Sequence, residues 1–340
     1  MDKQSIFLKA KGKVKNCRIC NDCNGVACRG EIPGLGGKDS GDSFIRNRTM
    51  IKKIKLNMDV LTMSSPISTE CHIFNEKFSI PVFVAPIASV AQNYGCELSD
   101  YEYNKMVIEA CKEFGVMSFT GDGIDIEKHF NGPLKAIDEN DGHGIVTMKP
   151  WVNEGIDARA KLLKDKKFKM LAMDVDSAGL PLLSGNDILV ETKDLAGLRY
   201  VKNKTNQKLI IKGVMSVPAA LDALEAKADA IVVSNHGGRV LDDTLAPIEV
   251  LSNISSVVKG KMTILVDGGI RNGNDIFKCL ALGADGVLIG RPCALATIGD
   301  GKQGLYDLLS EYKKELIQAM KMTGCHKITD ISRSCITITK

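Results

Sequence analysis

A histidine flanked by glycines, with an arginine three residues later, is the segment of this sequence best suited to acid–base chemistry. It reads Ser234-Asn235-His236-Gly237-Gly238-Arg239 and follows an apolar run. An imidazole is a general base near neutral pH, and a guanidinium holds a carboxylate through two parallel hydrogen bonds. We therefore expect His236 to act as a base, with Arg239 beside it as a binding group for an anionic molecule.

Two aspartates and a lysine at the ends of neighbouring apolar runs would support that base. Asp174 and Asp176 are two residues apart, so both side chains lie on one face of a strand, where one can orient the imidazole and stabilise its charged form. Lys212 ends the next apolar run, and an ammonium group on a buried strand requires an anionic partner.

Two glycine-rich segments further along the chain predict a phosphate site. Asp267-Gly268-Gly269-Ile270-Arg271 and Gly290-Arg291-Pro292 each place an arginine directly beside glycines. Glycines let backbone N–H groups approach an anion closely, and arginine adds bidentate donors for phosphate. The alternative is a pair of tight turns with surface arginines.

Four cysteines near the start of the chain have the spacing C-x₂-C-x₂-C-x₄-C: Cys17, Cys20, Cys23 and Cys28. Thiolates on a short loop can bind an iron–sulfur cluster or zinc, and the first three match a ferredoxin-type spacing. The fourth is one residue too far and lacks the following proline. Reduced thiols or a redox-labile pair are the alternatives.

Short apolar runs that alternate with segments of helical length must position these residues. The runs are nearly continuous and rich in Val, Ile, Leu or Ala, which is typical of strands buried on both faces. Eight such units predict an α/β fold, a (β/α)₈ barrel whose chemistry lies at the C-terminal strand ends, with a doubly wound sheet as the alternative. The expected strands are Ile80–Ala88, Gly115–Thr120, Gly144–Lys149, Lys169–Asp176, Lys208–Val214, Ala228–Asn235, Thr263–Gly268 and Gly286–Gly290, and the expected helices include Asp100–Phe114, Val217–Lys227 and Asn274–Leu282.

The remaining segments do not share this alternation. Residues 1–78 are expected to form an N-terminal extension packed on the barrel, with the cysteine cluster and a capping hairpin within Asn57–Ile80. The barrel is expected to span residues 79–325, and residues 326–340 to form a C-terminal tail.

The composition is that of an ordinary globular protein, with 340 residues, 44% hydrophobic and 25% charged. A net charge of +4, with dispersed basic residues and 5% aromatics, argues against a nucleic-acid partner and suits a small anionic ligand. The sequence shows neither an apolar run long enough for a membrane span nor a signal peptide. We therefore expect a cytoplasmic protein whose 11 cysteines are mostly reduced.

Several of these segments, in this order, resemble the FMN-dependent α-hydroxy acid oxidases and dehydrogenases, the family of glycolate oxidase, lactate oxidase and mandelate dehydrogenase. They are Ile211-Lys212-Gly213-Val214 and the segments 234–239, 267–271 and 290–292, and Val84-Ala85-Pro86-Ile87-Ala88 resembles the family strand whose end runs beneath the flavin. The resemblance covers about residues 40–325. It implies an FMN-binding barrel, a homotetramer, and oxidation of a small L-2-hydroxy acid to the 2-oxo acid, with oxygen or another acceptor taking the electrons.

The resemblance also implies a role for individual residues. His236 would take a proton from the substrate, Asp176 would pair with His236, and Arg239 would bind the substrate carboxylate. Lys212 would stabilise the anionic reduced flavin ring. The other implied FMN contacts are those of Ala85, Ile87, Ala88, Thr120, Thr147, Asp174, Ser234, Asp267, Gly269, Arg271, Gly290 and Arg291.

The sequence departs from the family pattern around the substrate. Lys149 stands where the family has a substrate-binding tyrosine, Thr147 where it has a glutamine and Asp174 where it has a threonine. A second arginine is replaced by the segment 178–183, and no tyrosine precedes Tyr94. Lys149 is therefore expected to bind substrate together with His236 and Arg239. Since the cysteine segment replaces the family's tyrosine-bearing region, a cluster there would offer electrons a route out of the flavin.

Three alternatives compete with this function. A redox-neutral flavin barrel similar to the type 2 isopentenyl diphosphate isomerases would lack the segment 234–239. A barrel similar to IMP dehydrogenase needs a nucleophilic cysteine where Asn235-His236-Gly237 stands, which excludes it. A thiol- or cluster-based redox protein with a vestigial flavin site would have no need to retain Lys212, Asp176 and Arg239 together with His236.

Overall fold

Eight parallel strands form the centre of the molecule. The structure, a computed structural model, describes residues 2–183, 185 and 190–339, so Met1 and Lys340, the ends of the expected extension and tail, lie outside the described residues. The strands follow the order β5-β4-β11-β10-β9-β8-β7-β6. They are β4 (Val82–Val84), β5 (Met117–Ser118), β6 (Ile145–Met148), β7 (Met170–Asp174), β8 (Lys208–Val214), β9 (Ala230–Val233), β10 (Thr263–Val266) and β11 (Gly286–Ile289).

Contacts between the two outermost strands close this sheet into a barrel. Phe119, just after β5, forms a parallel bridge with Ile145 of β6. The backbone N–H of Thr120 donates to the Ile145 carbonyl at 2.9 Å. The expected (β/α)₈ barrel is therefore confirmed over the doubly wound alternative, and each strand lies within an apolar run identified in the sequence.

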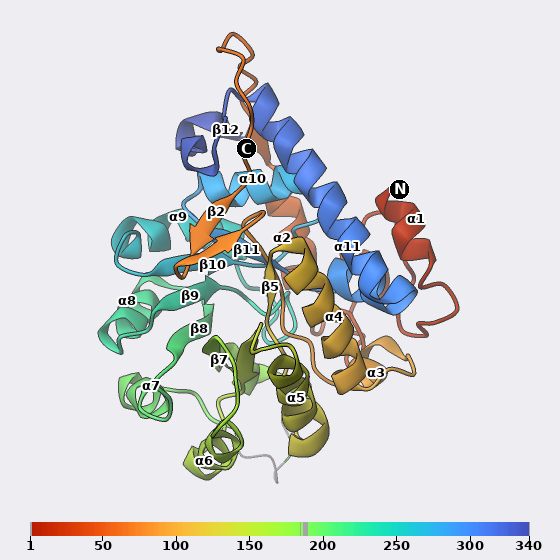
Figure 1. Cartoon of the computed structure of the whole chain (residues 1–340), viewed down its shortest axis with the longest axis vertical. Coiled ribbons are helices and arrows are strands. Elements are labelled where there is room, and N and C mark those ends of the chain that lie inside the picture. Colours follow the sequence, from red (N-terminus) through yellow and green to blue (C-terminus); the bar gives the residue numbers. More distant parts are fainter. Residues whose placement is uncertain (1, 184, 186–189, 340) are drawn as a thin grey trace.

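Helices follow each strand and cover the outside of the barrel (Figure 1). Ser99 begins α4 with a reciprocal capping box to Glu102, as its sequence favours. The longest helical segment breaks at Asp300 and Gly301, where the backbone leaves helical geometry. The helices after the strands are α3 (Val90–Tyr94) and α4 (Asp100–Phe114), then α5 (Gly132–Glu139), α6 (Asn153–Leu162), α7 (Leu195–Lys202), α8 (Val217–Glu225), α9 (Pro247–Val258), α10 (Gly273–Ala281) and α11 (Arg291–Met322).

A β-hairpin covers the N-terminal end of the barrel. Strands β2 (Cys71–Ile73) and β3 (Glu76–Phe78) pair antiparallel within the segment where a hairpin is expected. Phe78 packs against Phe83 of β4 with ring centroids 4.9 Å apart, and Lys208, at the start of β8, donates to the Phe74 carbonyl. The opposite, C-terminal end of the barrel remains available for a site.

The two ends of the chain pack against the barrel's outer layer. Helix α1 (Lys3–Leu8) lies beside α11, and Lys9 pairs with Asp300 at 2.6 Å (Figure 1). Strands β1 (Ile54–Leu56) and β12 (Ile336–Ile338) pair antiparallel, and α2 (Asp42–Lys52) precedes β1. None of the helices in the described ranges is both long and apolar enough to cross a membrane.

Candidate active site

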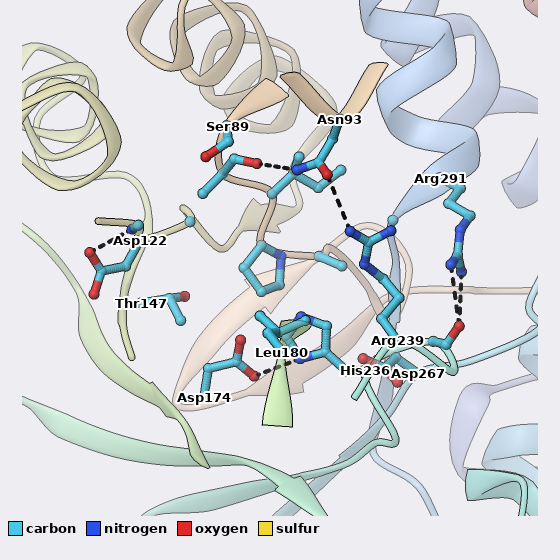
Figure 2. A pocket seen from close by; sticks show the side chains of 18 of the residues that line it. Ser89, Asn93, Asp122, Thr147, Asp174, Leu180, His236, Arg239, Asp267 and Arg291 are labelled. Carbon is cyan, nitrogen blue, oxygen red and sulfur yellow. Dashed lines mark hydrogen bonds and ion pairs between the residues drawn. The ribbon is translucent and has the colours of Figure 1, made fainter. Parts of the chain in front are cut away.

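A cavity of about 460 Å³ lies at the C-terminal ends of the barrel strands (Figure 2). This volume falls within the range of pockets that hold cofactors and small ligands. Most of the predicted site residues line this cavity. They are Ala85, Ile87, Ala88, Thr147, Lys149, Asp174, Lys212, His236, Arg239, Asp267, Gly269, Arg271, Gly290 and Arg291.

Three predicted residues lie behind the cavity wall instead. Asp176 is behind His236, to which it is hydrogen-bonded. The fully buried Ser234 accepts from the His236 backbone N–H at 3.0 Å and donates to Asp267 at 2.9 Å. The hydroxyl of Thr120 faces the Ile145 carbonyl at the barrel seam. Asp176 and Ser234 thus contact residues of the cavity wall, whereas Thr120 helps close the barrel.

The backbone around His236 is held in an unusual conformation. His236 itself has φ 57°, and Gly237 and Gly238 follow with φ 66° and 79°. A non-glycine residue in this left-handed region is strained and persists only where its surroundings fix it. Asn235 supplies part of that restraint, because its side-chain amide exchanges two hydrogen bonds with Asn47 of α2, at 2.8 and 2.9 Å. The strained turn aims the imidazole at the cavity.

The His236 ring contacts two carboxylates through the same nitrogen. Its Nδ1 lies 3.0 Å from Asp176 Oδ1 and 3.5 Å from Asp174 Oδ1. Burial lowers the pKa of His236 well below its usual value, although the Asp174 charge opposes this shift. Burial also raises the pKa of Asp176 well above its usual value. With Nδ1 engaged, Nε2 of a neutral imidazole is left to accept a proton.

Two lysines lie in this part of the cavity, and only one of them has a close carboxylate partner among the described residues. Lys212 donates to Asp174 at 2.8 Å and lies 3.9 Å from Asp267. Lys149 lines the cavity but its ammonium donates no hydrogen bond within the described part of the chain. Burial lowers the pKa of Lys149 below its usual value, against the attraction of Asp174. An anion in the cavity would provide the partner that Lys149 lacks.

A buried ion pair fixes the loop that carries Lys149. Asp122, four residues after β5, accepts from the Lys149 backbone N–H at 2.9 Å and from the Trp151 indole at 2.6 Å. The same carboxylate pairs with Arg159 of α6, whose guanidinium stacks 4.1 Å from the Trp151 ring centroid. The β5–α5 and β6–α6 loops are therefore held together beneath the cavity.

Arg239 reaches across the cavity mouth to the opposite side of the barrel. Its guanidinium donates to Asn93 of α3 at 3.2 Å and to the Gly34 carbonyl (Figure 2). Burial lowers its pKa to about 10, so the group remains a cation at neutral pH. It has no carboxylate partner in the described ranges, and a substrate carboxylate would supply one.

The residues on the other side of the cavity fit FMN. Thr147 Oγ1 and Asp267 Oδ1 are buried and have no hydrogen-bond partner among the described residues. Such orphaned groups require partners, which the polar atoms of a flavin and its ribityl chain would provide. Gly269 has φ 79°, and a Cβ there would lie 2.3 Å from the Asn47 carbonyl oxygen, so only glycine lets this loop approach α2.

The two predicted phosphate-binding arginines have their charges uncompensated. Arg271 donates to the carbonyls of Cys23 and Ile270, and Arg291 to those of Leu35 and Gly237. Neither forms an ion pair with a carboxylate in the described part of the chain. Two unpaired cations beside the glycines at the ends of β10 and β11 suit a phosphate group.

Sequence reasoning missed four contributors to the site. Asn93 binds Arg239 from a short helix after β4, and nothing in its local sequence distinguishes it from a surface asparagine. Asp122 was detectable as an acidic residue just beyond a strand end, and Trp151 as the single tryptophan of the chain. The segment 180–183, noted only for a missing arginine, lines the cavity with Leu180, Leu182 and Leu183.

Comparisons with known proteins agree with this architecture. The family model described as "FMN-dependent dehydrogenase" matches residues 35–182 and 161–338. The L-lactate dehydrogenase of Actinobacillus pleuropneumoniae serotype 5b is 31% identical over 88% of this chain and 92% of its own. The 2-hydroxyacid oxidase of Dictyostelium discoideum is 30% identical over 88% and 84% of the two chains.

Solved structures are similar as well. A mandelate oxidase variant with an FMN monooxide adduct has a TM-score of 0.73 and is 27% identical, over 89% of this chain and 93% of its own. With the barrel, a cavity that fits FMN and a family match over most of the chain, the protein is an enzyme of the FMN-dependent α-hydroxy acid oxidase and dehydrogenase family.

Proposed function

We propose that the enzyme oxidises a small L-2-hydroxy acid, similar to lactate or glycolate, to the 2-oxo acid, with His236 as the base. The observation that carries the proposal is the pairing of His236 with Asp176 in a cavity that also holds Arg239 and Lys149, neither of which has a carboxylate partner among the described residues. A base beside two free cations suits a substrate that carries both a removable proton and a carboxylate.

Arg239 and Lys149 bind the substrate carboxylate and thereby orient its α-carbon toward the flavin. His236 takes one proton through Nε2 while Asp176 stabilises the charged imidazole from Nδ1, at 3.0 Å. Bound FMN supplies the acceptor for the hydrogen and electron pair that leave the α-carbon. Lys212 places a fixed positive charge where negative charge develops on that acceptor.

Thr147, Asp174, Asp267 and Gly269 hold the polar parts of FMN, and Arg271, Gly290 and Arg291 its phosphate. Ala85, Ile87 and Ala88 of the β4–α3 loop line the cavity and would contact the flavin ring, for which the two alanines would leave room. Thr120 would contribute by closing the barrel seam, where its hydroxyl faces the Ile145 carbonyl. Ser234 would contribute by its hydrogen bond to Asp267. The electrons then pass to oxygen or to another acceptor.

The substrate side chain faces an apolar surface. Ile124 and three leucines of the segment 180–183 line the cavity. This composition favours short aliphatic side chains over charged ones.

The protein is also proposed to be cytoplasmic and to form a homo-oligomer, consistent with strongly exposed apolar residues such as Leu61 and Met63. Light scattering after size exclusion would measure the oligomer, and a mass of one chain at micromolar concentration would contradict it.

Turnover with a panel of acids tests the function. The FMN-loaded enzyme is assayed with L- and D-forms of lactate and longer 2-hydroxy acids, and with glycolate, using an artificial electron acceptor and detecting the 2-oxo acid as its hydrazone. We expect product from one or more short L-acids. Product from the D-forms only, or from none of the panel, would contradict the proposal.

A further inference from the structure

A second cavity, of about 330 Å³, lies next to the first and is lined by all four clustered cysteines, Cys17, Cys20, Cys23 and Cys28. Leu35, Arg271 and Arg291 line both cavities, so the two share a wall. The family match begins at residue 35 and leaves the cysteine segment outside it. This second cavity is therefore a feature of this chain that the family resemblance does not explain.

The segment that carries the four cysteines lines this cavity with its backbone held in constrained conformations. Ile19, between the first two cysteines, has φ 51°, a costly conformation for a β-branched residue. Gly25 has φ 88°, and a Cβ there would lie 2.7 Å from the Phe44 ring. Such backbone strain is typically retained where function requires the geometry.

Two N–H groups point at cysteine sulfurs of this segment. The Ile19 backbone N–H donates to Cys17 Sγ at 3.4 Å. Arg271 lies 3.6 Å from Cys23 Sγ through Nη2 and donates to the Cys23 carbonyl through Nε. Hydrogen bonds to ligating sulfurs are one of the means by which proteins tune iron–sulfur clusters.

The charges around this cavity suit an anionic occupant. Arg48 is paired with Asp22 and Asp275, but Arg271 and Arg291 have no carboxylate partner among the described residues. A cubane cluster with four thiolate ligands carries net negative charge, and the two guanidinium groups assigned above to the FMN phosphate line this cavity as well, so they would lie between the two anionic groups.

The spacing of the sulfurs distinguishes a cluster from zinc. Tetrahedral zinc with bonds of about 2.3 Å holds its sulfurs about 3.8 Å apart. In the described ranges, the one group of three ligating side chains with atoms within 4.8 Å of one another is Asp174, Asp176 and His236. No three of the four cysteine sulfurs therefore lie within 4.8 Å of one another, so they are not arranged as tetrahedral zinc requires.

We propose that Cys17, Cys20, Cys23 and Cys28 bind a [4Fe–4S] cluster in the cavity beside the FMN site. Four observations support this proposal. They are the spacing of the cysteines in the sequence, the wall shared by the two cavities, the N–H groups directed at sulfur, and the two arginines without a carboxylate partner among the described residues. The proposal does not depend on which hydroxy acid the enzyme oxidises.

Metal analysis of protein produced with iron and purified without oxygen tests the site. We expect about four iron and four acid-labile sulfide per chain, and a low-temperature EPR signal after dithionite reduction in addition to that of flavin. About one zinc per chain without sulfide would overturn the cluster. So would the absence of iron and sulfide after anaerobic incubation with ferrous iron, sulfide and a thiol reductant.

Matched cysteine variants test the ligands. Cys20→Ala removes an exposed member of the four, and Cys71→Ala alters a half-buried cysteine of β2 outside this cavity. We expect Cys20→Ala to lose at least half of the iron while keeping its FMN, and Cys71→Ala to keep both. Full iron content in Cys20→Ala, or equal iron loss in the two variants, would contradict the assignment. Retained FMN shows that the barrel is folded.

Discussion

At the scale of single residues, the site depends on a histidine that burial keeps neutral. His236 is strained at its backbone, bound to Asp176 through Nδ1 and free at Nε2. Its position after a strand and before two glycines was predictable from the sequence, because barrel chemistry lies at strand ends. The expectation that Asp174 and Asp176 share one strand face was wrong, because β7 ends at Asp174 and Asp176 lies in the following 3-10 helix, Val175–Gly179, from which it still reaches His236. Asp174 also lies 3.5 Å from the His236 ring. This contact depends on packing between neighbouring strands, which the spacing of residues in the sequence does not predict.

Replacing His236 by alanine should separate catalysis from cofactor binding. We expect kcat to fall by about three orders of magnitude, the scale of a lost general base, while FMN content stays within measurement error. His143→Ala is the matched control, because this half-buried histidine binds the Val116 carbonyl outside the cavity. A His236→Ala enzyme with kcat within tenfold of wild type would remove His236 from its role.

The pH dependence of kcat/KM should report the lowered pKa of His236. The base must be neutral, so activity is lost as pH falls through the folded pKa, which burial places below the ordinary value of about 6.5. We expect an acid limb below pH 6.5 and full kcat/KM at pH 7. An acid limb centred above pH 7 would show a raised pKa and contradict the account.

Lys149 offers a second test at this scale. Lys149→Met should raise KM for the hydroxy acid by about ten- to a hundredfold, because a partly buried charge pair is lost, with a smaller change in kcat. Lys149→Arg keeps the charge and should recover most of that loss. Because the lowered pKa makes Lys149 lose its proton earlier than an ordinary lysine, the wild-type KM should rise at alkaline pH and that of Lys149→Arg should not. Unchanged KM in Lys149→Met would exclude carboxylate binding.

At the scale of elements, strands and helices were more predictable than the ties between loops. Continuous apolar runs marked all eight strands because both faces are buried, and the expected Asp100–Phe114 helix matches α4. Apart from β8, which matches its run at both ends, the strands are shorter than the runs, since hydrogen bonding ends before the apolar residues do. The tie between Asp122 and Arg159 joins residues 37 apart in sequence, and only the closed barrel brings them together.

Breaking that tie should weaken the fold and the site together. Asp122→Ala leaves the Arg159 guanidinium buried without a counter-charge, and we expect a loss of about 3 kcal/mol in the free energy of unfolding. Urea denaturation measures it, with Asp141→Ala as the control because its pair with Lys112 is exposed and should matter by less than about 1 kcal/mol. Equal stability of both variants would show that the buried pair is not structural.

At the scale of the whole molecule, the hairpin β2–β3 closes one end of the barrel and leaves the site at the other. The cysteine segment and the glycine-rich loop after it lie against Arg271 and Arg291, so the N-terminal extension forms part of the wall around the phosphate end of the site. Composition suggested an anionic ligand, but only the fold shows that two adjacent cavities share these two cations.

The central claim is that this enzyme takes hydrogen and electrons from the α-carbon of an L-2-hydroxy acid. Anaerobic titration of the FMN-loaded enzyme with such acids, following the flavin absorbance, tests it without reference to the final electron acceptor. The account predicts stoichiometric bleaching by a short L-acid in the wild type, and bleaching slowed by about three orders of magnitude in His236→Ala. A yellow enzyme that no L-2-hydroxy acid bleaches would contradict it.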